Sequence, residues 1–466
     1  MMAPTALHWF RRDLRLGDNP AWAEATRHDQ AAGLVVIEPQ LVAAAGPFRK
    51  RAYLQAVVGL DHSLRSRGGR LWVAEGDPAR VVPQVADALG AQVVTFNSDV
   101  TRWSERRDQQ VTSTLSQPTR RYWGTLVHPP GSVLTAKGRL SRVFTAFYRR
   151  WVTMALAEGV TPGRAELISP PPGATLSDLR HDLPDEPWGE DQARGRLRSW
   201  WDRVDEYHMT RDHIGADDTS NVSAELRFGL LSPRQVAAEV GDHTPGRAAY
   251  VRQLAWRDWY AHLTAEHPDI DRVALRPEYG RIAWADGPEA DTVFEDWKAG
   301  LTGYPIVDAA MRELASTGRL HNRLRMVAAS FLVKDLLIDW RRGERWFRYL
   351  LIDGDIPQNA GNWQWVAGTG PDAAPYFRIF NPVTQSRRLD PEGLHLRRWL
   401  PELGGLDAHS IHAPWTVGRL ELASAGVTLG ETYPSPLVDH AKARRRTLDA
   451  YRQALQPSRH PHPAAT

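Results

Sequence analysis

The sequence contains no cysteine among its 466 residues. This absence excludes disulfides, thiolate metal sites and cysteine nucleophiles, and it fits a reducing compartment. Long apolar runs are missing too, because Lys334 and Asp335 interrupt the best candidate for a membrane span. The N-terminus, MMAPTALHWFRRDLRL, lacks the apolar stretch of a secretory signal peptide. These absences predict a cytoplasmic protein that does not cross a membrane.

A strong charge of either sign is also absent. The 58 basic and 55 acidic residues leave a formal net charge of only +3, which permits nucleic-acid binding without arguing for it. Tryptophan, in contrast, is abundant, with 19 copies. Most of these side chains are expected in the core or at interfaces, but they also suit base stacking or electron transfer.

The first 125 residues alternate between short apolar segments and amphipathic ones. Segments rich in β-branched and apolar residues predict strands that are covered on both faces. Helices are expected at about 48–67 and 78–89, where apolar residues recur on one face. This alternation predicts an α/β domain with a doubly wound parallel sheet of five strands. The expected strands are 6–10, 33–37, 70–74, 92–96 and 121–125.

No G-x-G-x-x-G follows the first expected strand, so Rossmann-type dinucleotide binding is not favoured there. That strand runs instead into WFRRDLRLGDNPAW. Arg11, Arg12 and Arg15 suit either a phosphate site or structural surface pairs with Asp13 and Asp18. The second interpretation is favoured, because charge runs are usually solvated.

Composition changes along the rest of the chain. Residues 131–195 are rich in Pro, Gly and acids and predict an interdomain linker that carries one helix at about 140–158. From residue 196 the pattern is helical. The predicted organisation is an α/β domain at 4–130, this linker, an all-α domain at 196–456 and a short tail at 457–466.

The stretch 303–380 places polar side chains among apolar helices. Buried charge is costly unless it is paired or bound to a ligand. A single Arg–Asp pair would be structural, but this density favours a concave site for a large polar and aromatic ligand. The side chains concerned are Asn322, Arg323, Arg325, Asp353, Asp355, Asn359, Asn362, Trp363 and Trp365.

Two earlier strings, DDTSNVS and YVRQLAWRDWYAHL, also carry polar and aromatic groups. The hydroxyls of the first predict either a simple helix cap or a phosphate site at a helix N-terminus. The aromatic residues of the second, Trp256 and Trp259, suit a core unless a ligand is present. His208, Asp212 and His213 have the wrong spacing for one helical face, so no metal site is predicted.

Taken with WFRRDLRLGDNPAW, these strings resemble the DNA photolyase and cryptochrome family, specifically class I cyclobutane pyrimidine dimer photolyases. The resemblance covers nearly the whole chain. It implies a helical domain that binds FAD and UV-damaged DNA, and an N-terminal domain for an antenna chromophore. It also implies a monomer. The antenna is expected to be 8-hydroxy-5-deazaflavin, or alternatively methenyltetrahydrofolate, with Asp99 at its site.

The resemblance implies a set of cofactor-binding residues. Asn221 and Val222 depart from the family's commoner Arg-Leu, which should change detail only. Arg325 and Asp353 are expected to pair beside the flavin, and Asn359 is expected to face its N5. The full set is Tyr207, Thr219, Ser220, Asn221, Val222, Ser223, Gln253, Arg257, Asn322, Arg325, Asp353, Asp355 and Asn359.

A second implied set binds the damaged DNA. Gln253 stands where dimer photolyases usually have Glu, and Gln is also usual in (6-4) photolyases and signalling cryptochromes. Met326 and Asn359 favour dimer repair instead. Trp256 and Trp365 would form the aromatic walls around a flipped-out dimer. The expected DNA contacts are Arg211, Gln253, Trp256, Arg323, Met326 and Trp365.

The resemblance further implies an electron relay through Trp363, Trp340 and Trp284, beside Asn359 as a catalytic group. The implied function is light-driven repair of cyclobutane dimers by electron transfer from excited reduced FAD. The alternatives are a (6-4) photolyase and a blue-light photoreceptor without repair activity. A fourth interpretation, without the resemblance, is a nucleotide-binding α/β domain fused to a helical interaction domain.

Overall fold

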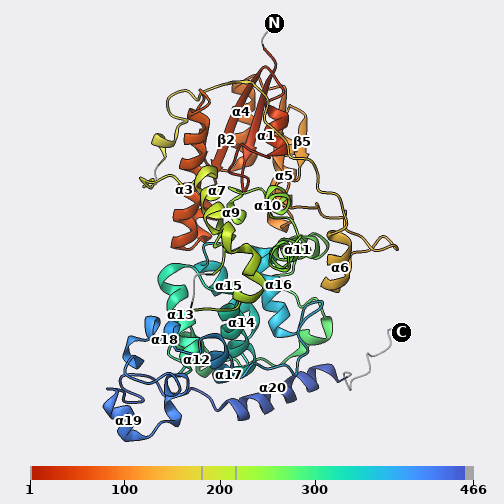
Figure 1. The fold of residues 1–466 in the computed structure, drawn as a ribbon. Coiled ribbons are helices and arrows are strands. Elements are labelled where there is room, and N and C mark those ends of the chain that lie inside the picture. The colour runs from red at the N-terminus through yellow and green to blue at the C-terminus, as the bar shows by residue number, and fades with distance from the viewer. Residues whose placement is uncertain (1–2, 180–181, 216–217, 457–466) are drawn as a thin grey trace, which may run out of the picture. The chain divides into compact units, whose positions relative to one another are not determined.

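A computed structural model describes residues 3–179, 182–215 and 218–456, so the predicted tail at 457–466 lies outside the described residues. The chain forms two compact units (Figure 1). The first comprises Met1–Arg211, Asp218–Asp269 and Tyr349–Gln358. The second comprises Asp212–Asp217, Ile270–Arg348 and Asn359–Thr466.

The first unit contains the sheet, whose strands appear in red and orange in Figure 1. All pairs are parallel and the order is β3-β2-β1-β4-β5, which confirms the predicted doubly wound α/β fold. The order reverses between β1 and β4, and at such a point the carboxyl ends of the strands leave a crevice suited to ligands. The strands are β1 (Thr5–Phe10), β2 (Gln30–Ile37), β3 (Trp72–Glu75), β4 (Val93–Asn97) and β5 (Thr119–Tyr122).

Helices of the first unit begin repeatedly with a capping side chain followed by proline, which suits the first helical turn. Asp77 caps α4, Ser232 caps α10 and Thr244 caps α11 in this way. The helices are α1 (Pro20–Ala25), α2 (Pro39–Ala44), α3 (Pro47–Arg65), α4 (Pro78–Ala88), α5 (Arg102–Thr114), α6 (Phe144–Trp151), α7 (Glu190–Trp200), α8 (Tyr207–Thr210), α9 (Ser223–Phe228), α10 (Pro233–Val240) and α11 (Pro245–Glu266).

The remaining helices belong mainly to the second unit, and its described part is helical as predicted. A π-helical turn, Phe331–Asp335, follows α14 directly. The helices are α12 (Pro288–Ala299), α13 (Pro305–Thr317), α14 (Asn322–Ser330), α15 (Trp340–Leu350), α16 (Ile356–Ala367), α17 (Pro382–Leu389), α18 (Leu394–Trp399), α19 (Arg419–Ser424) and α20 (His440–Leu455).

Three details of the predicted elements are wrong. The last strand ends at Tyr122, earlier than expected, and the helix expected at 140–158 is only α6. A two-residue strand, β6 (Glu166–Leu167), lies in the expected linker and pairs with β2. Its residues carry no strand pattern of their own, because the pairing extends an edge that already exists. No helix of the described residues is long and apolar enough to span a membrane.

Candidate functional site

A network of buried charges in the first unit joins segments that are far apart in the sequence. Arg12, after β1, donates to Asp99 over 3.1 Å and pairs with Asp355 at 3.1 Å. Arg227, on α9, donates to Gly354 O and lies 3.7 Å from Asp355. Asp355, expected as a flavin contact, is therefore held by two arginines.

Arginines of this network repel one another. Burial opposes the charge on Arg12, yet Asp355 and Asp99 raise its pKa. Burial, followed by repulsion from Arg12, lowers the pKa of Arg227 to about 9. The same two causes lower the pKa of Arg257. The Arg257 guanidinium donates to the main-chain oxygens of Thr125 and Leu226. Arg12 thus repels two neighbouring guanidiniums, and an anion bound among the three would relieve that repulsion.

Gly229 makes this arrangement possible at the end of α9. Its φ is +69°, in the left-handed region, and a Cβ here would collide with the Arg12 carbonyl oxygen. Only glycine allows this close approach without strain. The approach brings Arg227 and Arg12 into one network.

The motif Thr219–Ser223 leads into α9 and ends at its first residue, but the prediction that its hydroxyls cap the helix is wrong. The N-cap is Val222, which forms no side-chain capping bond. The Ser220 hydroxyl instead bonds Tyr250 Oη at 3.0 Å, and Thr219 Oγ1 bonds Asn221 Oδ1 at 3.3 Å. Asn221 has a positive φ of 52°.

Tyr207, another predicted cofactor residue, begins α8 and packs edge-on against Tyr250, with ring centroids 5.3 Å apart. Arg211 follows the same short helix, at its C-cap. Tyr250 itself is buried on α11 and bonds Ser220. The structure therefore brings Tyr207 and Ser220 together around one tyrosine.

The α11 helix carries Gln253 and Trp256, both partly exposed. Gln253 Nε2 donates to Ala249 O of the same helix at 3.1 Å. This bond leaves its amide able to donate once more and to accept at Oε1. Trp256 stacks on Phe144 of α6, with ring centroids 3.5 Å apart.

In the second unit, Asn359 on α16 is anchored by a buried acid. Its Nδ2 donates to Glu344 O at 2.8 Å and to Glu344 Oε1 at 3.0 Å. Arg348 lies 3.3 Å from the same carboxylate and also pairs with Asp271 at 3.2 Å. Burial raises the pKa of Glu344, and the charge of Arg348 opposes that rise.

Sequence reasoning missed Glu344. It lies in RRGERWF, which resembles a solvated charged helix, yet the Glu344 side chain is fully buried. The only signal was its spacing from Arg348, four residues later on one helical face. That spacing is common on exposed helices, so it does not identify a site.

The start of α14 collects three predicted residues around a sulfur atom. Asn322 Nδ2 lies 3.7 Å from Met326 Sδ, and Arg323 Nη1 lies 3.9 Å from it. Arg323 also forms a two-pronged bond to Asp212, at 2.7 and 2.8 Å. Arg325 Nε donates to Leu320 O, and its pairing with Asp353, which follows α15, stays a prediction.

The predicted relay tryptophans occupy different depths. Trp340 and Trp363 are buried, whereas Trp284 is only partly buried and lies edge-on to Tyr451. The Trp363 ring packs against Phe347, 5.0 Å away between centroids. Near contact along the relay stays a prediction. Trp365, the second expected wall, is partly exposed on α16.

A second cluster lies where β1 and β4 end, at the reversal of strand order. Arg11 pairs with Asp108, and Arg107 pairs with Glu38 at 2.8 Å. Both guanidiniums lie 4.9 Å from the Trp9 ring. Buried Nε and Nη2 of Arg11 make no hydrogen bond to the described residues. Such buried polar atoms without a partner cost free energy.

The expected surface pairs of the N-terminal arginines are wrong. Arg11 and Arg12 pair with residues distant in sequence, and Arg15 is buried among main-chain oxygens. Asp13 instead forms hydrogen bonds with His8 of β1 and Asn97 of β4, near the carboxyl ends of these strands. Asp99, expected beside an antenna, is already held by Arg12.

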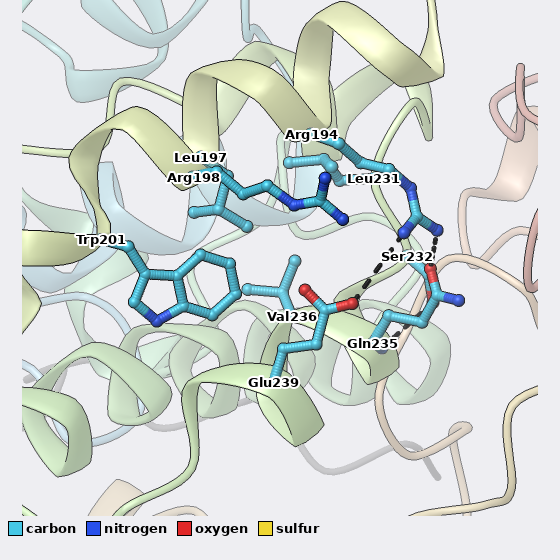
Figure 2. A pocket seen from close by; sticks show the side chains of 9 residues that line it. All are labelled: Arg194, Leu197, Arg198, Trp201, Leu231, Ser232, Gln235, Val236 and Glu239. Atoms are coloured by element: carbon cyan, nitrogen blue, oxygen red, sulfur yellow. Dashed lines mark hydrogen bonds and ion pairs between the residues drawn. The ribbon is translucent and has the colours of Figure 1, made fainter.

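A small hollow lies between α7 and α10 (Figure 2). Arg194 donates to Gln235 at 2.6 Å and pairs with Glu239 at 3.9 Å, so these rim charges satisfy one another. None of the residues lining it belongs to a predicted site. We assign it no ligand. Its lining comprises Arg194, Leu197, Arg198, Trp201, Leu231, Ser232, Gln235, Val236 and Glu239.

Two family models match the chain: one described as DNA photolyase, over residues 6–166, and one described as the FAD binding domain of DNA photolyase, over residues 250–453. The chain belongs to the DNA photolyase family. It is 40% identical to the deoxyribodipyrimidine photo-lyase of Escherichia coli, over 97% of this chain and 99% of that protein. It is 39% identical to the Streptomyces griseus protein of the same name, over 94% and 97%.

Solved photolyase-family structures share the fold over nearly the full chain. A bacterial class III photolyase from Agrobacterium tumefaciens matches with TM-score 0.90 and 34% identity, over 97% of this chain and 98% of that one. A Synechocystis cryptochrome matches with TM-score 0.85 and 31% identity, over 97% and 99%. Repair enzymes and a cryptochrome are therefore both near in structure, and class I is not singled out.

The family match supports FAD as the cofactor, and the buried network of the first unit fits it. Repulsion from Arg12 acts on both Arg227 and Arg257, although Asp99, Asp355 and Asp258 offset part of it. A pyrophosphate placed against these arginines would relieve this repulsion. In the second unit, Asn359 has its amide nitrogen committed to Glu344 and can accept at Oδ1, which suits the N–H of a reduced flavin.

Proposed function

We propose that this protein uses light to repair cyclobutane pyrimidine dimers in DNA. The observation that carries the proposal is the likeness to proteins named deoxyribodipyrimidine photo-lyase, which extends over 94–97% of the chain. The alternative without a flavin, an α/β domain fused to an interaction domain, does not account for the FAD-binding match. Bound FAD, reduced and excited by light, would supply an electron that opens the cyclobutane ring and then returns to the flavin, so that no net redox change occurs.

The chain's own residues would bind the flavin and orient it. Asn359, fixed by Glu344, would accept a hydrogen bond at Oδ1 from the N–H of the reduced flavin. Arg12, Arg227 and Arg257 would neutralise the cofactor's phosphates. The remaining predicted contacts of the flavin, from Thr219 to Ser223 and at Asn322, Arg325 and Asp353, are part of this proposal.

The lesion would be flipped out of the duplex, because a dimer stacks and pairs poorly. Trp256 and Trp365, both partly exposed, would supply apolar walls. Gln253 would hydrogen-bond the pyrimidine edge with its second amide N–H and with Oε1. Arg211 and Arg323 would contact backbone phosphates, with Asp212 moderating the charge of Arg323.

An antenna chromophore is proposed for the N-terminal domain, at the cluster around Arg11 and Trp9. A photolyase from Sulfolobus tokodaii has been solved with two FAD molecules, with the implication of a novel light-harvesting cofactor in that protein. A flavin-type antenna, including the predicted 8-hydroxy-5-deazaflavin, suits the Arg11 nitrogens better than an apolar ligand would. The predicted domain boundaries, the monomeric state and the cytoplasmic location stay proposals.

A photoreceptor role is the second candidate, favoured by the likeness to a Synechocystis cryptochrome. The two candidates differ in one outcome. A photoreceptor would bind FAD and respond to light without repairing DNA. A (6-4) photolyase, suggested by Gln253, would repair the other lesion.

A repair assay separates these functions. The purified protein, with reduced flavin verified by absorbance, is mixed with oligonucleotides that carry a cyclobutane thymine dimer or a (6-4) product. Each mixture is compared under blue light and in darkness. We expect light-dependent loss of the cyclobutane dimer alone. Loss of the (6-4) product alone, or of neither lesion, would contradict the proposal and favour the corresponding alternative.

A further inference from the structure

Trp256 does not stand alone on α11. The Phe144 ring lies nearly parallel to its indole, with an interplanar angle of 13° and 3.5 Å between ring centroids. That separation is the thickness of two aromatic rings in contact, so no base can enter between them. Phe144 is 1% exposed, whereas Trp256 is partly exposed. One face of the indole is therefore covered by protein.

The fold fixes the covering ring in place. Trp151, at the end of α6, donates from Nε1 to the buried Asp258 of α11 at 2.9 Å. Trp259 of α11 donates back to Ser141 O, just before α6, also at 2.9 Å. Hydrogen bonds at both ends of α6 hold it against α11. The position of Phe144 thus does not depend on a ligand.

Two further rings limit how the indole can turn. Trp259 meets Trp256 edge-on, at 78° and 5.3 Å, and Tyr260 lies tilted at 5.7 Å. With these contacts and Phe144, the Trp256 plane has one orientation in the free protein. An aromatic wall that is already oriented loses little conformational entropy when a base stacks on it.

We propose that Phe144 is a positioning residue for damaged DNA: it covers one face of Trp256 and presents the opposite face to the lesion. This inference rests on the proposed role of Trp256 in binding the dimer. Removing the Phe144 ring would free the indole to turn and would expose its second face. Both changes weaken lesion stacking, and neither affects backbone contacts elsewhere.

The test compares Phe144→Leu with Phe147→Leu in the flavin-loaded full chain. Phe147 is an equally buried ring on the same helix, and its ring contact is with His262. Dissociation constants are measured in the dark for a duplex with one thymine dimer and for the undamaged duplex. We expect Phe144→Leu to weaken dimer binding about five-fold and undamaged binding less than two-fold. Phe147→Leu should change both by less than two-fold.

A double-mutant cycle excludes a merely structural effect. Trp256→Ala alone should weaken dimer binding, and adding Phe144→Leu should then cost less than two-fold more. A full five-fold further loss in that background would overturn the inference. So would equal weakening of dimer and undamaged DNA by Phe144→Leu, or no effect of Trp256→Ala on dimer binding.

Two controls keep the result interpretable. If Phe144→Leu does not fold with flavin bound, Phe144→Met, which fills similar volume without a ring, replaces it and carries the same expectation. If the unaltered protein shows no preference for dimer DNA and no repair, the proposed function fails. If it binds and repairs while the variants show no coupling, only the role of Phe144 fails.

Discussion

At the scale of single residues, two hydrogen bonds to Glu344 fix the Asn359 side chain in the predicted site. Glu344 is fully buried, and its Oε1 faces both the Asn359 amide and the Arg348 guanidinium. A neutral amide suits this position because a second carboxylate there would face the first across 3 Å. Two buried carboxyl groups so close cannot both ionise.

Asn359→Asp tests this constraint through its pH dependence. One carboxyl of the new pair should have a raised pKa in the folded state, so folding stability is lost as pH rises through that value. We expect the variant's stability deficit, relative to the unaltered protein, to be about 3 kcal/mol larger at pH 8 than at pH 5, for a rise of about three pKa units. Urea unfolding followed by tryptophan fluorescence measures the deficit.

The matched background for this experiment is Glu344→Gln. Asn359→Asp introduced there adds only one carboxylate, so its deficit should change by less than about 1 kcal/mol between the two pH values. Deficits that are equal at pH 5 and pH 8 in the original background would show that the two side chains do not interact as the structure places them.

At the scale of elements, the π-helical turn Phe331–Asp335 has a clear structural role. It places Lys334 in the core, 1% exposed, with Nζ 3.8 Å from the Tyr451 ring centroid and 3.2 Å from Ala367 O. Thr447 Oγ1 donates to Lys334 O, which ties α20 to the same turn. The sequence offered Lys334 only as an interruption of an apolar run.

Lys334→Met should change how stability depends on pH. Burial lowers the pKa of Lys334 to about 7, so above pH 7 the unfolded chain binds more protons than the folded one. Stability of the unaltered protein therefore rises with pH relative to the variant. We expect the difference to shift by about 3 kcal/mol between pH 7 and pH 9.5. Ala367 O keeps a second donor, Tyr451 Oη at 2.6 Å.

Urea unfolding at both pH values checks this prediction, and Lys442→Met, an exposed lysine on α20, is the control. The control should show the same pH dependence as the unaltered protein. If Lys334→Met also does, the Lys334 ammonium remains fully charged in the core, stabilised by the Tyr451 ring.

At the scale of the whole molecule, the charges nearly balance at +3, and many arginines pair with acids. Long-range attraction to DNA is therefore weak, and binding depends on a few local contacts. Such binding releases few counterions. The logarithm of the association constant should fall with the logarithm of salt concentration with a slope of about −3 to −5.

Titrations of undamaged duplex between about 50 and 200 mM KCl would measure this slope. The dimer-bearing duplex should show nearly the same slope with a higher affinity, because stacking on Trp256 adds no ionic contact. A slope of about −10 would instead indicate an extended basic surface that the balanced composition does not suggest.

The sequence by itself determined the elements. Short apolar runs predicted the parallel strands, because burial on both faces demands them, and the ordered motifs carried the family resemblance and the FAD prediction. Polar residues clustered after apolar helices predicted a site at Asn359 without its partner.

Only the tertiary structure decided which residues meet. Glu344 meets Asn359, Arg12 meets Asp355, and Phe144 covers Trp256. Each of these pairs joins segments that are distant in the sequence, and the packing of the fold sets the distance between them. Periodicity reports only which face of an element is buried, because it depends on neighbours along the chain. The partner of a buried charge is chosen by the fold.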